Sequence, residues 1–156
     1  MGRVDAREAL DSCMMFARKA PVLRRILIVE DEPLIAFDTE HFLEDEGFQI
    51  VATIDRADAA EALIEDGVPL DLVIVDVALA EGGSGVDVAR AAFDAGIRVL
   101  FVTGACPPEA RLLADGCLAK PYSQRHLLAA IKAIGQVAEG ERPRKLPSGF
   151  SLYRAA

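Results

Sequence analysis

The sequence contains few cysteines, and it lacks the features expected of a membrane or secreted protein. Its three cysteines, Cys13, Cys106 and Cys117, are odd in number and show no CxxC spacing, so we expect neither a disulfide framework nor a zinc site. No apolar run approaches the roughly 18 residues that a membrane-spanning helix needs. The N-terminus carries acids and no uninterrupted apolar stretch, unlike a secretory signal. The sequence therefore favours a soluble protein of the reducing cytoplasm.

Basic residues are scarce in the middle of the chain. Residues 26–135 hold seven Lys or Arg against twenty Asp or Glu, a net charge of -13, whereas the whole chain of 156 residues carries -8. So acidic a core repels phosphates, which excludes direct binding of nucleic acid as its role. The length is typical of one domain with a substantial core, and we expect no separate output domain within it.

Short apolar runs alternate with helical patterns over most of the chain. The runs within 24–31, 70–77 and 99–102 are continuously apolar, which is typical of strands buried on both faces of a parallel sheet, whereas 49–54 and 117–119 are weaker strand candidates. We expect strands within 24–31, 49–54, 70–77, 99–102 and 117–119, and helices at about 33–46, 57–66, 86–95, 108–115 and 123–137. Ser123 is the expected N-cap of the last helix. Five such units predict an α/β fold with a doubly wound five-stranded parallel sheet, flavodoxin-like (βα)5, in strand order 2-1-3-4-5.

Polar side chains follow four of the predicted strands. Glu30 and Asp31 follow the first strand, Asp76 the third, Thr103 the fourth and Lys120 the fifth. Because the carboxyl ends of parallel strands meet at one edge of a sheet, we expect these side chains to converge. Three neighbouring carboxylates repel one another unless a cation lies among them. An open cluster of carboxylate oxygens suits Mg²⁺, which we therefore predict as the cofactor.

The residue types at this edge suit phosphoryl transfer. An ionised aspartate can attack phosphorus as a nucleophile, while Lys120 and the Thr103 hydroxyl can bind the remaining phosphoryl oxygens. Glu32, next to the acidic pair, is interpreted as capping the following helix, whose dipole its charge complements. The three glycines within 82–85 do not match a P-loop, so we interpret them as shaping a flexible loop.

Four stretches resemble the receiver domains of two-component response regulators. They are Ile-Leu-Ile-Val-Glu-Asp-Glu-Pro (26–33), Asp-Leu-Val-Ile-Val-Asp (71–76), Phe-Val-Thr-Gly (101–104) and Leu-Ala-Lys-Pro-Tyr (118–122). Each is weak alone, but all four occur in the family's order over about residues 24–137. The third stretch also resembles the Phe-Ala-Thr-Gly-type motif of an alphaproteobacterial receiver subgroup.

The resemblance implies a phosphorylation site and its metal. Asp76 is implied to be the phospho-acceptor, with Glu30 and Asp31 as the acidic pair serving Mg²⁺ and the backbone carbonyl of Ala78 as a further metal ligand. A sensor histidine kinase or a phosphotransfer protein would donate the phosphoryl group. A downstream protein would then bind the altered surface. We expect no membrane partner. A homodimer is a further possible assembly.

The resemblance also implies the roles of the remaining site residues. Lys120 resembles the lysine that pairs with the phosphate, and Thr103 resembles the switch hydroxyl. Cys117 stands where the family usually has an aromatic switch residue. Ala78 and Ala105 stand at positions that influence hydrolysis of the acyl phosphate, and their small apolar side chains cannot position a water. We expect slow self-dephosphorylation and no other enzymatic activity.

Two other functions are compatible with the residues at the strand ends. One alternative is a Mg²⁺-dependent phosphatase with an aspartyl-phosphate intermediate, resembling haloacid-dehalogenase-like enzymes, and the other is a degenerate receiver that only binds partners. Residues 1–22 are interpreted as an N-terminal extension, 23–137 as the receiver domain, and 138–156, with glycines and prolines among charges, as a flexible tail.

Overall fold

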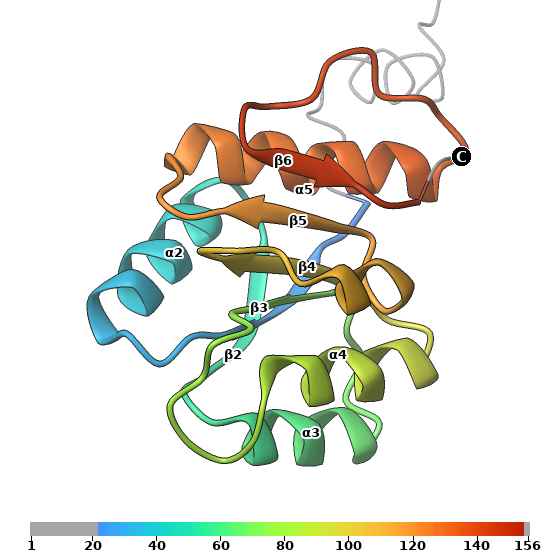
Figure 1. The fold of residues 1–156 in the computed structure, drawn as a ribbon. Coiled ribbons are helices and arrows are strands. Elements are labelled where there is room, and N and C mark those ends of the chain that lie inside the picture. The colour runs from blue at the N-terminus through green and yellow to red at the C-terminus, as the bar shows by residue number, and fades with distance from the viewer. Residues whose placement is uncertain (1–21, 155–156) are drawn as a thin grey trace, which may run out of the picture.

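The computed structural model describes residues 22–154, which form one six-stranded sheet with helices on both faces (Figure 1). The elements in chain order are β1 (Arg25–Val29), α2 (Pro33–Asp45), β2 (Gln49–Ile54), α3 (Ala57–Glu65), β3 (Leu72–Val75), α4 (Gly85–Asp94), β4 (Arg98–Thr103), the 3₁₀ helix η1 (Pro108–Leu112), β5 (Gly116–Ala119), α5 (Gln124–Ala138) and β6 (Phe150–Leu152). The strand order is β2-β1-β3-β4-β5-β6. The predicted order 2-1-3-4-5 is therefore confirmed, with one strand added.

The sheet separates two apolar layers. Helices α3 and α4 cover one face, and α2 and α5 cover the other (Figure 1). Alternate residues of one strand enter different layers: Leu27 and Val29 of β1 pack with α3 and α4, whereas Ile26 and Ile28 pack with α2 and α5. This arrangement explains the continuous apolar runs within the inner strands β1, β3 and β4. None of the helices within residues 22–154 is long and apolar enough to cross a membrane.

Side-chain caps define where two of the helices begin. The Ser123 hydroxyl accepts a hydrogen bond from the backbone N–H of His126 at 3.1 Å, which confirms the expected N-cap of α5. Ser84 and Asp87 form a reciprocal capping box at the start of α4. Glu32 is the N-cap residue of α2, but its exposed side chain makes no capping hydrogen bond. Its contribution is limited to negative charge near the helix N-terminus.

The connection between β4 and β5 is shorter than the other crossovers. We expected a helix at about 108–115, and the structure instead has the 3₁₀ helix η1 at Pro108–Leu112. Residues 113–115 continue directly toward β5, and the backbone N–H of Asp115 donates to the Val99 carbonyl at 2.9 Å. Too few residues lie between the two strands for a full α-helical crossover, so the chain uses the tighter turn.

Residues 138–156 were expected to be a flexible tail, but part of this segment, Phe150–Leu152, forms strand β6. It pairs antiparallel with β5, with Cys117 opposite Ser151 and Leu118 opposite Phe150. Gly116 permits this close approach, because a Cβ there would lie 2.6 Å from the Phe150 ring. The tail strand therefore covers the β5 edge of the sheet. The predicted extension at 1–22 lies outside the described residues except for residue 22.

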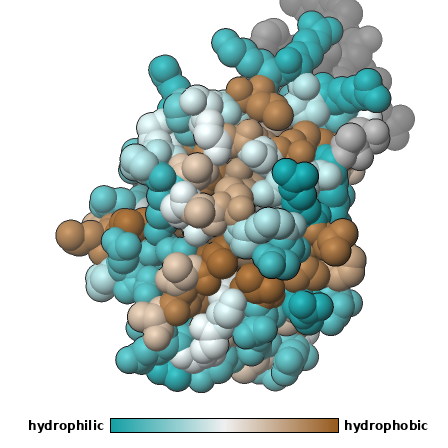
Figure 2. All heavy atoms as spheres, in the orientation of Figure 1, coloured by the Kyte–Doolittle hydropathy of each residue, from teal (hydrophilic) through white to brown (hydrophobic). Residues whose placement is uncertain are grey.

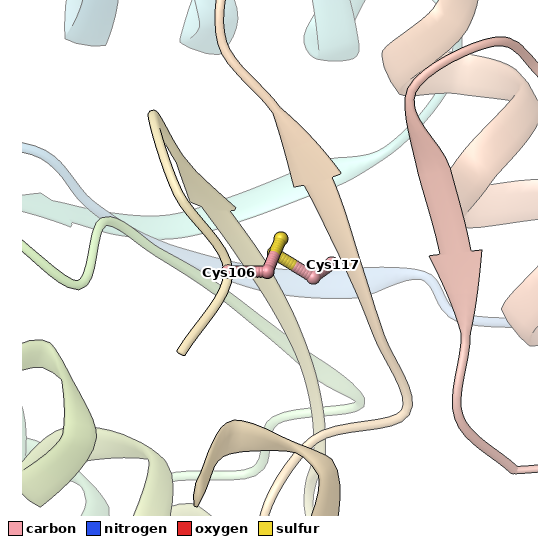
Figure 3. Close-up of a disulfide and its surroundings, with 2 residues drawn as sticks. All are labelled: Cys106 and Cys117. Atoms are coloured by element: carbon pink, nitrogen blue, oxygen red, sulfur yellow. A yellow bond between two sulfur atoms is a disulfide. The ribbon is translucent and has the colours of Figure 1, made fainter. Parts of the chain in front are cut away.

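Two of the three cysteines form a disulfide, which contradicts the expectation that the sequence holds no disulfide framework. Cys106, in the loop after β4, is bonded to Cys117 of β5, and their Cα atoms are 6.2 Å apart (Figure 3). The odd number and irregular spacing of cysteines concealed the pair. The connection through η1 brings the loop after β4 next to β5, a proximity that spacing along the sequence does not show.

Candidate functional site

The carboxyl ends of the parallel strands bring an acidic cluster together. Glu30 and Asp31 follow β1 and Asp76 follows β3, and each offers a carboxylate oxygen that lies within 4.8 Å of those of the other two. Glu30 is 4% exposed and Asp76 is 5% exposed, whereas Asp31 is half-buried. The predicted convergence of these acids is therefore present. Parallel pairing of β1 with β3 places them side by side.

Lys120 lies within hydrogen-bonding distance of two members of this cluster. Its ammonium nitrogen Nζ lies 2.8 Å from Oδ2 of Asp76 and 3.1 Å from Oε2 of Glu30. Its backbone N–H donates to the carbonyl of Thr103 at 2.8 Å, which places the ends of β4 and β5 next to each other. Thr103 is buried at the end of β4. The structure thus brings all five of the strand-end residues to one edge.

At Glu30 and at Lys120, burial and neighbouring charge have opposite effects on the pKa, and in both residues the net result is a raised pKa. Burial raises the pKa of Glu30, and the neighbouring Lys120 only partly offsets it. Burial would lower the pKa of Lys120, but hydrogen bonds and charge from Asp76 and Glu30 outweigh it and raise the pKa. Lys120 is consequently protonated at neutral pH. Among the described residues, the Lys120 ammonium pairs with two of the three carboxylates, which leaves an excess of negative charge that a divalent cation would balance.

The loop between β3 and α4 is held against the acidic cluster by its backbone. Ala78 donates its N–H to Oδ1 of Asp76, and Ala80 donates its N–H to Oδ2 of Asp31, both at 2.9 Å. Gly85 is required at the start of α4, because a Cβ there would collide with the Asp76 carbonyl oxygen. The loop therefore orients two of the three carboxylates.

Two salt bridges and two glycines shape the outer part of the same loop. Arg56 contacts Glu81 at 2.8 Å and Asp58 at 3.0 Å, which ties the loop to the start of α3. Gly82 and Gly83 have φ angles of 77° and 106°, which side chains rarely adopt. These two glycines allow the chain to turn within the loop.

A pocket of about 440 Å³ opens beside the site, between α2 and the start of α5. Ile35 and Thr39 of α2 line one side, and Lys120, Pro121 and Tyr122 line the other. Tyr122 is half-buried, and burial raises the pKa of its hydroxyl. The pocket gives a route from the surface of α2 to the lysine of the acidic cluster.

The fold and the site define a doubly wound α/β protein with an acidic, lysine-containing centre at the carboxyl edge of its parallel strands. The family model for the response regulator receiver domain matches residues 26–132, and the chain belongs to this family.

Curated relatives and solved structures agree with this assignment. The chain is 30% identical over 121 residues to the phyllosphere-induced regulator PhyR of Methylorubrum extorquens, covering 72% of this chain and 43% of the relative. It is 36% identical over 120 residues to the phosphate regulon transcriptional regulatory protein PhoB of Escherichia coli, covering 71% of this chain and 51% of the relative. The chain thus spans about half the length of these relatives.

A CheY-like response regulator receiver domain from Methanospirillum hungatei JF-1 shares the fold. It superposes with a TM-score of 0.67 at 30% identity, covering 76% of this chain and 98% of that chain. A receiver protein from Sinorhizobium medicae, with a TM-score of 0.64 and 22% identity, shows the same fold and covers 73% of this chain and 95% of that one.

Sequence reasoning did not find every feature of the site. The ion pair between Lys120 and Glu30 joins residues 90 positions apart, and the sequence shows only that both follow strands. The pocket beside Tyr122 depends on how α2 packs against α5, for which no sequence motif exists. The disulfide between β5 and the loop after Thr103 was also missed.

Proposed function

We propose that this chain accepts a phosphoryl group on Asp76 from a sensor histidine kinase or a phosphotransfer protein, with Mg²⁺ as cofactor. The observation that carries the proposal is the Asp76 carboxylate itself, which is buried, bound by Lys120 at 2.8 Å and set among two further carboxylates. Phosphorylation would then alter a surface that a downstream protein reads. The receiver domain proper would comprise residues 23–137.

The proposed reaction needs no general base, because an ionised Asp76 has no proton to remove. A carboxylate oxygen forms the new bond to phosphorus while the bond from phosphorus to the donor's imidazole nitrogen breaks, leaving the electron pair on that nitrogen. Oδ1 is already held by the Ala78 N–H, which orients the carboxylate. Lys120 would pair with the phosphoryl oxygens, and the Thr103 hydroxyl would bind another of them after the transfer.

The donor set at the site fits Mg²⁺. Glu30, Asp31 and Asp76 offer hard carboxylate oxygens, and the backbone carbonyl of Ala78 is a further ligand in the proposal. These donors are too few to enclose an ion, which suits a metal that retains waters and accepts phosphate oxygens. When bound, Mg²⁺ would neutralise charge on the phosphoryl group.

The surface of α2 supports docking of the phosphoryl donor beside the site. Leu34 is 80% exposed and Phe37 is 59% exposed on this helix, and Figure 2 shows hydrophobic residues protruding over α2 at the left edge of the molecule. The pocket beside α2 reaches Lys120. A donor protein that presents phosphohistidine on a helix would cover these apolar side chains while it delivers the group to Asp76.

Substitution of Asp76 tests the proposed site. Acetyl phosphate with Mg²⁺ should phosphorylate the full chain, and Asp76→Asn should abolish labelling because its amide is not a nucleophile. Asp94→Asn makes the same change on an exposed residue at the end of α4 and should leave labelling unchanged. Intact-mass spectrometry measures the added phosphate. Undiminished labelling of Asp76→Asn would refute the assignment.

We propose further that the phosphoryl group is lost slowly. Ala78 and Ala105 have small apolar side chains that cannot position an attacking water. A time course of phosphate release from the purified phosphoprotein measures the lifetime. Loss within seconds would contradict this proposal.

A further inference from the structure

We propose that the Cys106–Cys117 pair is a second covalent modification site, a reversible thiol–disulfide switch coupled to Asp76. The inference rests on the proposed function of Asp76. The pair lies between two residues of the phosphorylation site along the chain: Cys106 is the third residue after Thr103, and Cys117 is the third before Lys120. The disulfide therefore cross-links the segments that carry both of them (Figure 3).

The disulfide restrains the loop that follows Thr103. That loop leaves the end of β4, where Thr103 pairs in register with Ala119 of β5. In the oxidised chain, Cys106 is held to β5 with a Cα–Cα distance of 6.2 Å. Residues 104–106 are thus anchored at one end by the sheet and at the other by the sulfur–sulfur bond. They can move relative to β5 only within that short span.

Phosphorylation of Asp76 requires rearrangement next to this loop. Lys120 Nζ lies 2.8 Å from Oδ2 of Asp76, which leaves no space for phosphorus between the two atoms. The ammonium must therefore move to the phosphoryl oxygens, and in the proposed function the buried Thr103 hydroxyl comes to bind another oxygen of the same group. Both changes occur at the strand ends that the disulfide ties together. The oxidised chain should resist them more than the reduced chain does.

Reduction should release the loop without unfolding the domain. The two cysteines are only 11 positions apart in the sequence, so the disulfide closes a short loop. The strands at its ends remain paired by four register pairs, from Leu100 with Gly116 to Thr103 with Ala119. Cys117 is fully buried in the apolar layer of α3 and α4, where a free thiol packs as a small apolar group. The cross-link is therefore local.

The burial of the two cysteines indicates the direction of exchange. Cys106 lies half-buried in a loop, whereas Cys117 is fully buried in β5. A thiolate of a dithiol reductant would attack Cys106 Sγ, and the Cys117 sulfur would leave with the electron pair and take up a proton. The reductant's second thiol would then displace Cys106 and form the reductant's own disulfide. Two thiols are oxidised as one disulfide is reduced.

The test measures binding of beryllofluoride with Mg²⁺, a stable phosphoryl mimic, to the full chain in both redox states. All measurements use the Cys13→Ser background, so that the switch pair supplies the only thiols. The reduced chain should bind at least about fivefold more tightly, which is the lower range of typical allosteric coupling. Cys106→Ser should bind like the reduced chain and should not respond to a dithiol.

If the redox state changes the affinity for beryllofluoride, then beryllofluoride must change the redox equilibrium of the cysteine pair. This second measurement does not depend on activity. In a redox buffer of defined potential, beryllofluoride should shift the pair toward the reduced form by the same factor. Equal affinities in the two redox states, or unfolding on reduction, would overturn the switch. Binding to neither state would instead overturn the proposed function of Asp76, so the two failures are distinguishable.

Discussion

Substitution of Gly116 by alanine should displace β6 from the edge of the sheet. A Cβ at this position would lie 2.6 and 2.7 Å from two ring carbons of Phe150 and 2.8 Å from the Ser151 carbonyl oxygen. Carbon atoms in ordinary contact are about 3.5–4.0 Å apart, so β6 would have to move by about 1 Å. Rotating the Phe150 ring is insufficient, because the Ser151 oxygen belongs to the backbone of β6.

The size of the effect follows from overpacking. Inserting a methyl group into a filled position typically costs about 1–3 kcal/mol in the free energy of unfolding. Alanine is intrinsically better than glycine within a strand by about 0.5–1 kcal/mol, so the clash must exceed that gain. We expect Gly116→Ala to destabilise the chain by about 0.5–2 kcal/mol, the difference between the two lower values and between the two upper values.

A double-mutant cycle with Phe150 isolates the contact. Phe150 is 8% exposed, and Phe150→Ala should cost about 2–3 kcal/mol through lost burial. In the double variant the ring is absent, so Gly116→Ala should cost less than it does in the parent. Urea denaturation midpoints at constant m-value measure the four stabilities. Additive effects within about 0.5 kcal/mol would show that the two residues do not meet.

Two other substitutions test the packing and the electrostatics independently. Gly135→Ala in α5 should stabilise the chain by about 0.5–1 kcal/mol, because alanine has a higher helix propensity than glycine. The added Cβ would lie at ordinary contact distances of 3.9 Å from Val22 and 4.0 Å from Leu23. A lower thermal midpoint of unfolding would contradict this packing. Asp71→Asn should cost about 1–2 kcal/mol at pH 7, because Asp71 accepts hydrogen bonds from the Arg25 side chain and backbone. Those hydrogen bonds lower the pKa of Asp71, so its contribution is present above the unfolded-state pKa of about 3.9 and is lost as the pH falls through the lower folded value. Urea midpoints of the parent and Asp71→Asn should therefore differ by a constant amount from pH 7 to about pH 4 and converge only below it, and a difference that does not narrow below that pH would refute the assigned ion pair.

Local patterns in the sequence were sufficient for most of the parallel fold. Strands such as Leu72–Val75 are apolar at every position because both faces are covered, and helices end where Gly47 or Gly96 can adopt positive φ. Ser123 predicted the start of α5 through its own hydroxyl. These features depend on residues close together in sequence. The helix expected at 108–115 was wrong in type, because the tight connection to β5 overrides the helical pattern.

The candidate site was predictable to the extent that topology determines it. Once the strand order follows from alternating strands and helices, Glu30, Asp31 and Asp76 must meet at one edge. The contacts within the edge were not predictable. The distance of 2.8 Å between Lys120 and Asp76, and the hydrogen bond from Ala80 to Asp31, depend on side-chain rotamers and on the course of the β3–α4 loop.

The sequence by itself determined the order of the elements and the residue types at the strand ends, because hydrophobic periodicity and turn residues act locally. Only the tertiary structure decided that Phe150–Leu152 forms a sixth strand and that Cys106 meets Cys117. Strand addition uses backbone hydrogen bonds, which any sequence without proline can make. A disulfide requires two Cβ atoms about 3.8 Å apart, a proximity set by packing between β5 and its neighbouring loop.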